Sequence, residues 1–134
     1  MKDQVTSIEQ SKRLIELGVP AERASMVWHR MFRGKKTGYT EWGLKIGPIQ
    51  KFPRLEVLQI TPAYTVADLL MMLPPKISWQ DPSDGNFRMR RYMGENGIEW
   101  VVDYDCFIAN DVCIINALVK AITLLVSTKH ELNL

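Results

Sequence analysis

Residues 87–106, FRMRRYMGENGIEWVVDYDC, decide the fold class of this chain. Polar and apolar side chains alternate on either side of Asn96-Gly97, a dipeptide that favours two-residue hairpin turns. The sequence therefore predicts an antiparallel hairpin with one charged face and one core face. The expected charge pairs are Arg90 with Asp103 and Arg88 with Asp105, and the expected core face carries Phe87, Met89, Met93, Trp100, Val102, Tyr104 and Cys106.

Helical patterns lie on both sides of this hairpin. Residues 111–127 carry apolar side chains around most of a helical circumference, which predicts a long C-terminal helix buried on several sides. Thr65 and Asp68 have the spacing of a capping box, and the apolar stripe that follows them ends at Pro74-Pro75. A short middle helix is therefore expected after Thr65.

Two helices are expected near the N-terminus. Thr6 and Glu9 have capping-box spacing and Gly18 supplies a stop, which places the first helix at residues 7–17. A proline opens a second expected helix over residues 20–32, in which apolar side chains recur at helical spacing. Those side chains are Ala24, Val27, Trp28 and Met31.

The composition is that of one globular domain spanning residues 1–134, with 46% hydrophobic and 24% charged residues. Alternating patterns predict further strands at residues 42–46 and 55–60. The expected fold is α+β: an antiparallel sheet of three to five strands packed with a long C-terminal helix and a short middle helix, plus an N-terminal helical hairpin.

No segment is expected to enter a membrane. The longest apolar stretch, residues 112–126, is shorter than the roughly 20 residues that cross a bilayer. The first ten residues lack the apolar core of a signal peptide. We therefore expect a cytoplasmic protein.

Charge is distributed unevenly along the chain. The segment 28–54 contains seven basic residues against one acid, Glu41, whereas the chain from Glu95 onward contains six acids against two lysines. The formal net charge of +2 is too small by itself to predict a polyanionic partner. Whether the basic segment binds nucleic acid stays open at this point.

No grouping of residues predicts catalysis, a metal site or a cofactor. The two histidines, His29 and His130, have no recognisable nucleophile partner, and the two cysteines lack the spacing of a zinc site. No glycine-rich phosphate-binding motif is present. Asp103 and Asp105, which alternate like an acid/base pair, are expected to be paired with arginines. The chain is therefore interpreted as a non-enzyme.

One nucleic-acid hypothesis comes from the two N-terminal helices. Residues 17–20 followed by the second expected helix resemble a helix-turn-helix, and the basic loop 30–36 follows directly. Leu14 argues against this motif, because a small residue is needed at that position to let the helices approach. The candidate phosphate contacts are Arg30, Arg33, Lys35 and Lys36.

The leading hypothesis is a non-enzymatic interaction protein that binds a protein partner or itself, as a homodimer formed through the last helix. Its motivation is the nearly continuous apolar circumference of that helix. Met71, Met72 and Arg91 are candidate partner contacts, because methionines adapt to varied surfaces and Arg91 falls on the apolar hairpin face. Tyr39 and Trp42 are expected in the core.

Three phrases of the sequence resemble a group of small proteins encoded in prophages and mobile elements of anaerobic gut bacteria. They are QSKRLIELGVPA at residues 10–21, YTVADLL at residues 64–70 with Leu73-Pro74 behind it, and NALV at residues 116–119. The resemblance implies a phage-derived cytoplasmic protein. It implies no mechanism and carries over no functional residue, and the chain departs from the group at Met71-Met72, where such proteins are more polar.

Overall fold

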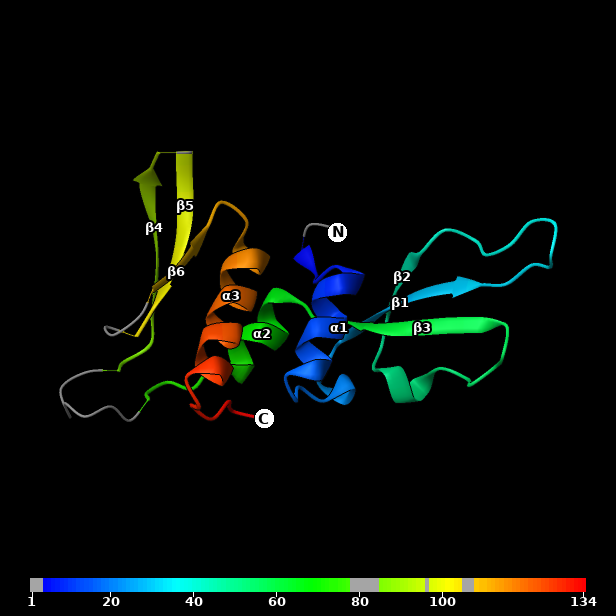
Figure 1. Cartoon of the computed structure of the whole chain (residues 1–134), viewed down its shortest axis with the longest axis horizontal. Coiled ribbons are helices and arrows are strands. Elements are labelled where there is room, and N and C mark those ends of the chain that lie inside the picture. The colour runs from blue at the N-terminus through cyan, green and yellow to red at the C-terminus, as the bar shows by residue number, and fades with distance from the viewer. Residues whose placement is uncertain (1–3, 78–84, 96, 105–107) are drawn as a thin grey trace. The chain divides into compact units, whose positions relative to one another are not determined.

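A computed structural model describes residues 4–77, 85–95, 97–104 and 108–134 of the chain (Figure 1). The fold is α+β, with two three-stranded antiparallel sheets and three α-helices among these residues. The chain divides into two compact units, Met1–Asp68 and Leu69–Leu134. The expected single sheet of three to five strands is therefore wrong, because each unit builds a sheet of its own.

The first unit combines one α-helix with a sheet of strand order β2-β1-β3. In chain order its elements are α1 (Ile8–Glu16), the 3₁₀-helix η2 (Ala21–Arg23), β1 (Met26–Met31), β2 (Gly43–Ile46), the 3₁₀-helix η3 (Ile49–Lys51) and β3 (Leu58–Ala63). Helix α1 packs against β3 (Figure 1). The core beneath it contains Val5, Met26, Trp28 and Ala63.

The N-terminal helical hairpin is absent, and this corrects the sequence prediction. Residues Met26–Met31 form the central strand β1 instead of a second helix. Val27 and Trp28 point to opposite faces of the sheet and are both buried, so the first half of β1 is covered on both faces. Such a strand shows no two-residue alternation, so its apolar residues matched helical spacing without forming a helix.

Helix α1 begins one residue later than expected. Ser7, not Thr6, caps it: the Ser7 hydroxyl accepts from the Gln10 amide, and the Gln10 side chain accepts from the Ser7 amide. The stop at Gly18 is confirmed, since Gly18 has a φ of 101°, a conformation that favours glycine after a helix. Thr6 is fully buried in the unit's core.

The second unit contains a sheet of order β4-β5-β6, built from β4 (Arg88–Gly94), β5 (Gly97–Asp103) and β6 (Ile108–Asp111). The C-terminal helix α3 (Ile114–Ser127) is confirmed, but it begins three residues later than residue 111 because Asp111 ends β6; it packs against β5 and β6 (Figure 1). The short helix α2 (Val66–Met72) is confirmed as well, and the unit boundary falls within it. Thr65 and Asp68 cap it reciprocally, as their spacing predicts.

The predicted hairpin forms, but its register differs by two residues. Gly94 pairs with Gly97, so Arg88 lies opposite Asp103. A shift of two residues keeps each side chain on its expected face. The expected core face is wrong at its turn end, because Met93 is 74% exposed. The predicted positions of Asp105 and Cys106 lie outside the described residues.

None of the helices in the described part of the chain is long and apolar enough to span a membrane.

Candidate functional site

The four candidate phosphate contacts gather on one β-hairpin of the first unit. Arg30 is half-buried on β1, whereas Arg33, Lys35 and Lys36 are exposed in the loop that leads to β2. Two main-chain hydrogen bonds close this loop, from the Arg33 amide to the Gly38 carbonyl and from the Gly38 amide to the Gly34 carbonyl, each at 2.8 Å. The structure therefore separates Arg30 from the three loop cations.

The candidate partner contacts of the second unit have different environments. Met71 is 64% exposed, whereas Met72 is fully buried. Arg91 is exposed on β4 and lies over the Trp100 ring, 5.0 Å from its centroid. Of the two methionines, only Met71 presents its side chain to solvent.

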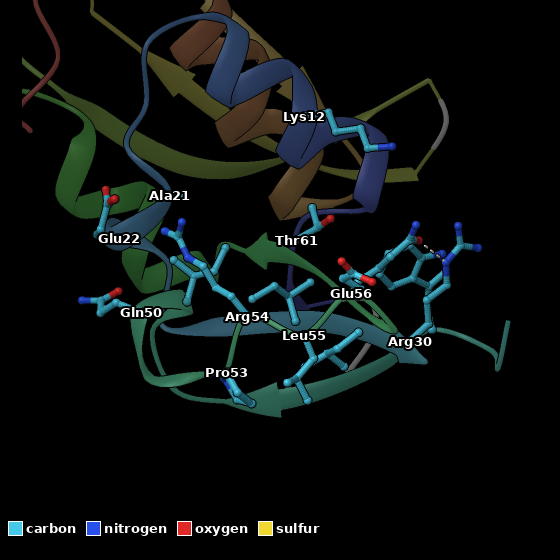
Figure 2. A pocket seen from close by; sticks show the side chains of 15 residues that line it. Lys12, Ala21, Glu22, Arg30, Gln50, Pro53, Arg54, Leu55, Glu56 and Thr61 are labelled. Atoms are coloured by element: carbon cyan, nitrogen blue, oxygen red, sulfur yellow. Dashed lines mark hydrogen bonds between the residues drawn. The ribbon is translucent and has the colours of Figure 1, made fainter. Parts of the chain in front are cut away.

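An open groove of about 830 Å³ lies in the first unit (Figure 2). It is lined along one side by β3, from Leu58 to Thr61, and by the segment 53–56 that precedes this strand. Lys12 and Arg30 lie on one side of the view in Figure 2, and Glu22 lies on the opposite side. Charged side chains of both signs, including Arg54 and Glu56, therefore line the groove beside β3.

β3 is an edge strand, and its residues 58–61 line this groove. The Phe32 amide donates to the Val57 carbonyl at 2.7 Å, and this continues the β1–β3 register. In an antiparallel pair hydrogen-bonded positions alternate, so Gln59 bonds to β1 while the main chain of Leu58 and Ile60 points outward. The Leu58 amide is used in a turn with Leu55. The Ile60 amide is therefore the outward main-chain donor that remains for a ligand between Leu58 and Thr61.

The same edge is closed beyond Ile60. Pro62 occupies an outward position and has no amide hydrogen to offer. Farther along, the Thr6 amide donates to the Tyr64 carbonyl at 2.9 Å, and the Tyr64 amide donates to Thr6 Oγ1 at 3.0 Å. Val5 also pairs with Thr65. The exposed edge is thus limited to the stretch that borders the groove.

Arg30 is held in one orientation where it lines the groove. Its Nε donates to Gln59 Oε1 at 2.7 Å, and Gln59 Nε2 donates to Tyr39 Oη at 3.2 Å. The guanidinium carbon lies 4.3 Å from the Tyr39 ring centroid and 4.5 Å from the Trp42 ring centroid. These two rings and one hydrogen bond orient the guanidinium plane.

Sequence reasoning missed this arrangement, because it placed Tyr39 and Trp42 in the core. Tyr39 is exposed, and Trp42 is half-buried. The available signal was the position of two aromatic residues within the basic segment 28–54. Gln59 gave no signal, since its role depends on the pairing of β1 with β3.

A smaller groove of about 410 Å³ lies in the second unit between β6 and α3. Ile108, Val119 and Leu124 contribute apolar side chains to it. Ile108 is 56% exposed and belongs to β6, the edge strand of its sheet. The opposite edge strand, β4, carries three arginines, which discourage pairing with another strand. β6 carries no lysine or arginine.

The buried carboxylates of the second unit are paired. Asp103 lies 3.5 Å from Arg88 and 4.0 Å from Arg90, which confirms that arginines neutralise it. Glu99 accepts from Asn110 at 3.3 Å, and its hydrogen bond with Tyr92 raises the pKa of that phenol. Each carboxylate therefore has a structural role as a hydrogen-bond or ion-pair partner.

Asp111 and His29 also have pKa values that local interactions shift. The hydrogen bond from Lys120 Nζ, at 2.8 Å, lowers the pKa of Asp111, and the Cys113 amide adds to the effect. Burial, followed by the charge of Lys45, lowers the pKa of His29 on β1. Within the residues that the structure describes, no three His, Cys, Asp or Glu side chains are grouped to hold a metal ion.

Comparisons with protein-family models, with curated proteins and with solved structures find no match to this chain.

Proposed function

We propose that the chain is a non-enzymatic protein-binding module that takes an extended segment of a partner along the free edge of β3. Two findings support this proposal: the alternation of hydrogen bonds turns the main chain of Ile60 away from β1, and Ile60 lines an open groove. An extended peptide that adds to a sheet edge gains main-chain hydrogen bonds, and neighbouring pockets select its side chains.

The dimensions of the edge suit a short segment. The groove borders β3 from Leu58 to Thr61, a length of roughly 13 Å at about 3.3 Å per strand residue. Apolar side chains of Leu55, Leu58 and Ile60 line the same groove. A segment of about four residues therefore finds main-chain partners along one side and apolar surface beside them.

Proline substitution tests this proposal without removing a bond of the native sheet. Ile60→Pro deletes the outward amide, just as Pro62 lacks one naturally. Ile46→Pro is the matched control: the Gly47 amide donates to the Ser25 carbonyl, so the alternation turns the Ile46 amide outward on the opposite edge of the same sheet.

The assay is selection of displayed random heptapeptides on the immobilised chain, followed by affinity measurements with the selected peptides. We expect Ile60→Pro to abolish binding and Ile46→Pro to leave it intact, with both variants retaining the native circular dichroism spectrum. Selected peptides that bind Ile60→Pro as tightly as the unmodified chain would refute edge binding.

The groove between β6 and α3 supports a second interaction, the association of the chain with a copy of itself. We propose that β6 pairs antiparallel with β6 of a second copy, which brings the exposed Ile108 against the apolar groove beside α3. Such a pair is self-complementary about a two-fold axis. β6 itself carries no lysine or arginine, in contrast to β4, and this favours β6 as the pairing edge. Lys120 of α3 donates to the Asn110 carbonyl of β6 at 3.1 Å, so the proposed pairing requires Lys120 to give up this carbonyl wherever the partner strand uses it.

A second candidate function, nucleic-acid binding, is favoured by the exposed loop that carries Arg33, Lys35 and Lys36. Phe32 and Tyr39 pack against each other at its base, with ring centroids 5.2 Å apart and ring planes inclined by 56°. Basic groups beside exposed aromatic rings suit single-stranded nucleic acid. The helix-turn-helix version of this idea is withdrawn, because β1 replaces its second helix.

Binding to a thymidine oligonucleotide at several salt concentrations tests the second candidate. It predicts affinity that falls steeply with salt and is lost when the three loop cations become alanine. Undetectable binding at low salt would remove it. The resemblance to prophage-encoded proteins adds only a proposed setting, that of a phage-derived protein, to either function.

A further inference from the structure

The orientation of Arg30 bears on which peptides the β3 groove would accept. Its guanidinium is stacked on Tyr39 and Trp42 and bonded through Nε to Gln59. Among the described residues, no hydrogen bond or ion pair engages its two terminal nitrogens. Arg30 therefore lines the groove with an oriented guanidinium whose two terminal nitrogens remain available to a ligand.

We propose that Arg30 makes the β3 groove selective for a carboxylate side chain, so that the partner segment is acidic as well as extended. This inference rests on the proposed function of the groove. A carboxylate matches the two-pronged geometry of a guanidinium and accepts two parallel, charge-assisted hydrogen bonds. Because the rings already restrict Arg30, little of its conformational freedom is lost when the anion binds.

The charges around Arg30 agree with an acidic ligand and supply a second test. Lys12 also lines the groove and adds positive potential to it (Figure 2). Glu56 also lines the groove and opposes an incoming carboxylate. Neutralising Glu56 should therefore strengthen the preference for an acidic peptide, whereas removing the positive charge of Lys12 should weaken it.

The experiment uses degenerate heptapeptides with one fixed central position, either Glu or its neutral isostere Gln. Both pools are titrated against the full chain, and the ratio of the two affinities is the readout. We expect the Glu pool to bind at least about tenfold more tightly, the effect of one charge-assisted pair. The Arg30→Lys variant keeps the positive charge but lacks the paired donors of a guanidinium. Its preference for the Glu pool over the Gln pool should therefore fall below about threefold.

The Arg33→Gln variant is the matched control, because Arg33 lies in the exposed loop of the same hairpin and does not line the groove. Its ratio should equal that of the unmodified chain, and the ratio of Glu56→Gln should rise. Circular dichroism confirms that each variant is folded. A thymidine oligonucleotide serves as a competitor in a parallel arm.

The outcomes separate this inference from the proposed function. If both pools bind equally and Ile60→Pro abolishes that binding, the groove takes peptides but carboxylate selectivity is refuted. If neither pool binds, the proposed function fails and this inference fails with it. A Glu preference that Arg30→Lys leaves unchanged, or that Arg33→Gln removes, also refutes it. Displacement by the oligonucleotide at low salt would assign the surface to nucleic acid instead.

Discussion

The hydroxyl of Thr6 closes the end of the β3 edge that lies beyond the groove. It is fully buried, contacts Ser11 Oγ at 2.7 Å and accepts from the Tyr64 amide at 3.0 Å. Thr6→Val preserves the shape but leaves both of those groups without a partner. Each orphaned buried group costs about 1–3 kcal/mol, so we expect the free energy of unfolding to fall by about 3 kcal/mol.

A double-mutant cycle measured by urea unfolding tests the reasoning behind that number. Ser11→Ala alone should cost about 1 kcal/mol, because Thr6 still accepts from Tyr64. The double variant should be at least as stable as Thr6→Val alone, since it no longer contains an orphaned Ser11 hydroxyl. Additive losses, or a loss below about 0.5 kcal/mol for Thr6→Val, would refute the buried network.

Three other predictions concern the second unit. Lys120→Met removes the hydrogen bond that lowers the pKa of Asp111, so a carboxyl NMR titration should show this pKa rising toward its ordinary value. The lowered pKa stabilises the folded chain at pH values above the pKa of Asp111 in the unfolded chain. This stabilisation is lost as the pH falls through the pKa of Asp111 in the folded chain. An unchanged Asp111 pKa would exclude Lys120 as the main cause. Ile108→Lys should convert a self-associated chain to the 15.4 kDa monomer in light scattering, whereas a chain that is monomeric at high concentration before the change contradicts pairing through β6. Met71→Lys should change the free energy of unfolding by less than about 0.5 kcal/mol because Met71 is exposed, whereas Met72→Lys buries a charge and should prevent folding; equal effects in thermal unfolding would show that the two environments are misassigned.

Local signals in the sequence located most of the helices and turns correctly. Gly18 ends α1, the reciprocal cap of Thr65 and Asp68 opens α2, and the apolar circumference of residues 111–127 corresponds to the buried helix α3. Each of these signals acts between residues a few positions apart. Their physical cause is therefore contained in a short stretch of sequence.

The sequence could not show contacts that depend on distant pairing. The central strand β1 pairs with β2 and β3, which lie later in the chain, and its first three residues are all buried, so they show no alternating pattern. The hairpin register was ambiguous by two residues, because Gly94 and Gly97 offer an alternative to the Asn96-Gly97 loop and both registers keep the same faces. The error at β1 therefore comes from distance in sequence, whereas the error in register comes from the local choice between two turns.

The groove could not be predicted from the sequence, because the residues that form it are distant from one another along the chain. Arg30 was identified as a basic candidate, but its orientation depends on Gln59, which is 29 positions away along the chain. The free edge of β3 depends on which side of that strand β1 occupies. Neither composition nor periodicity contains that information.

Amide hydrogen exchange at β3, with and without a selected heptapeptide, tests the free edge most directly. In the free chain we expect the Ile60 amide to exchange rapidly while those of Gln59 and Thr61 are protected by their bonds to β1. Bound peptide should protect Ile60 and leave its neighbours unchanged. Protection of Ile60 before any peptide is added, or rapid exchange that persists at saturation, would contradict a binding site at this edge.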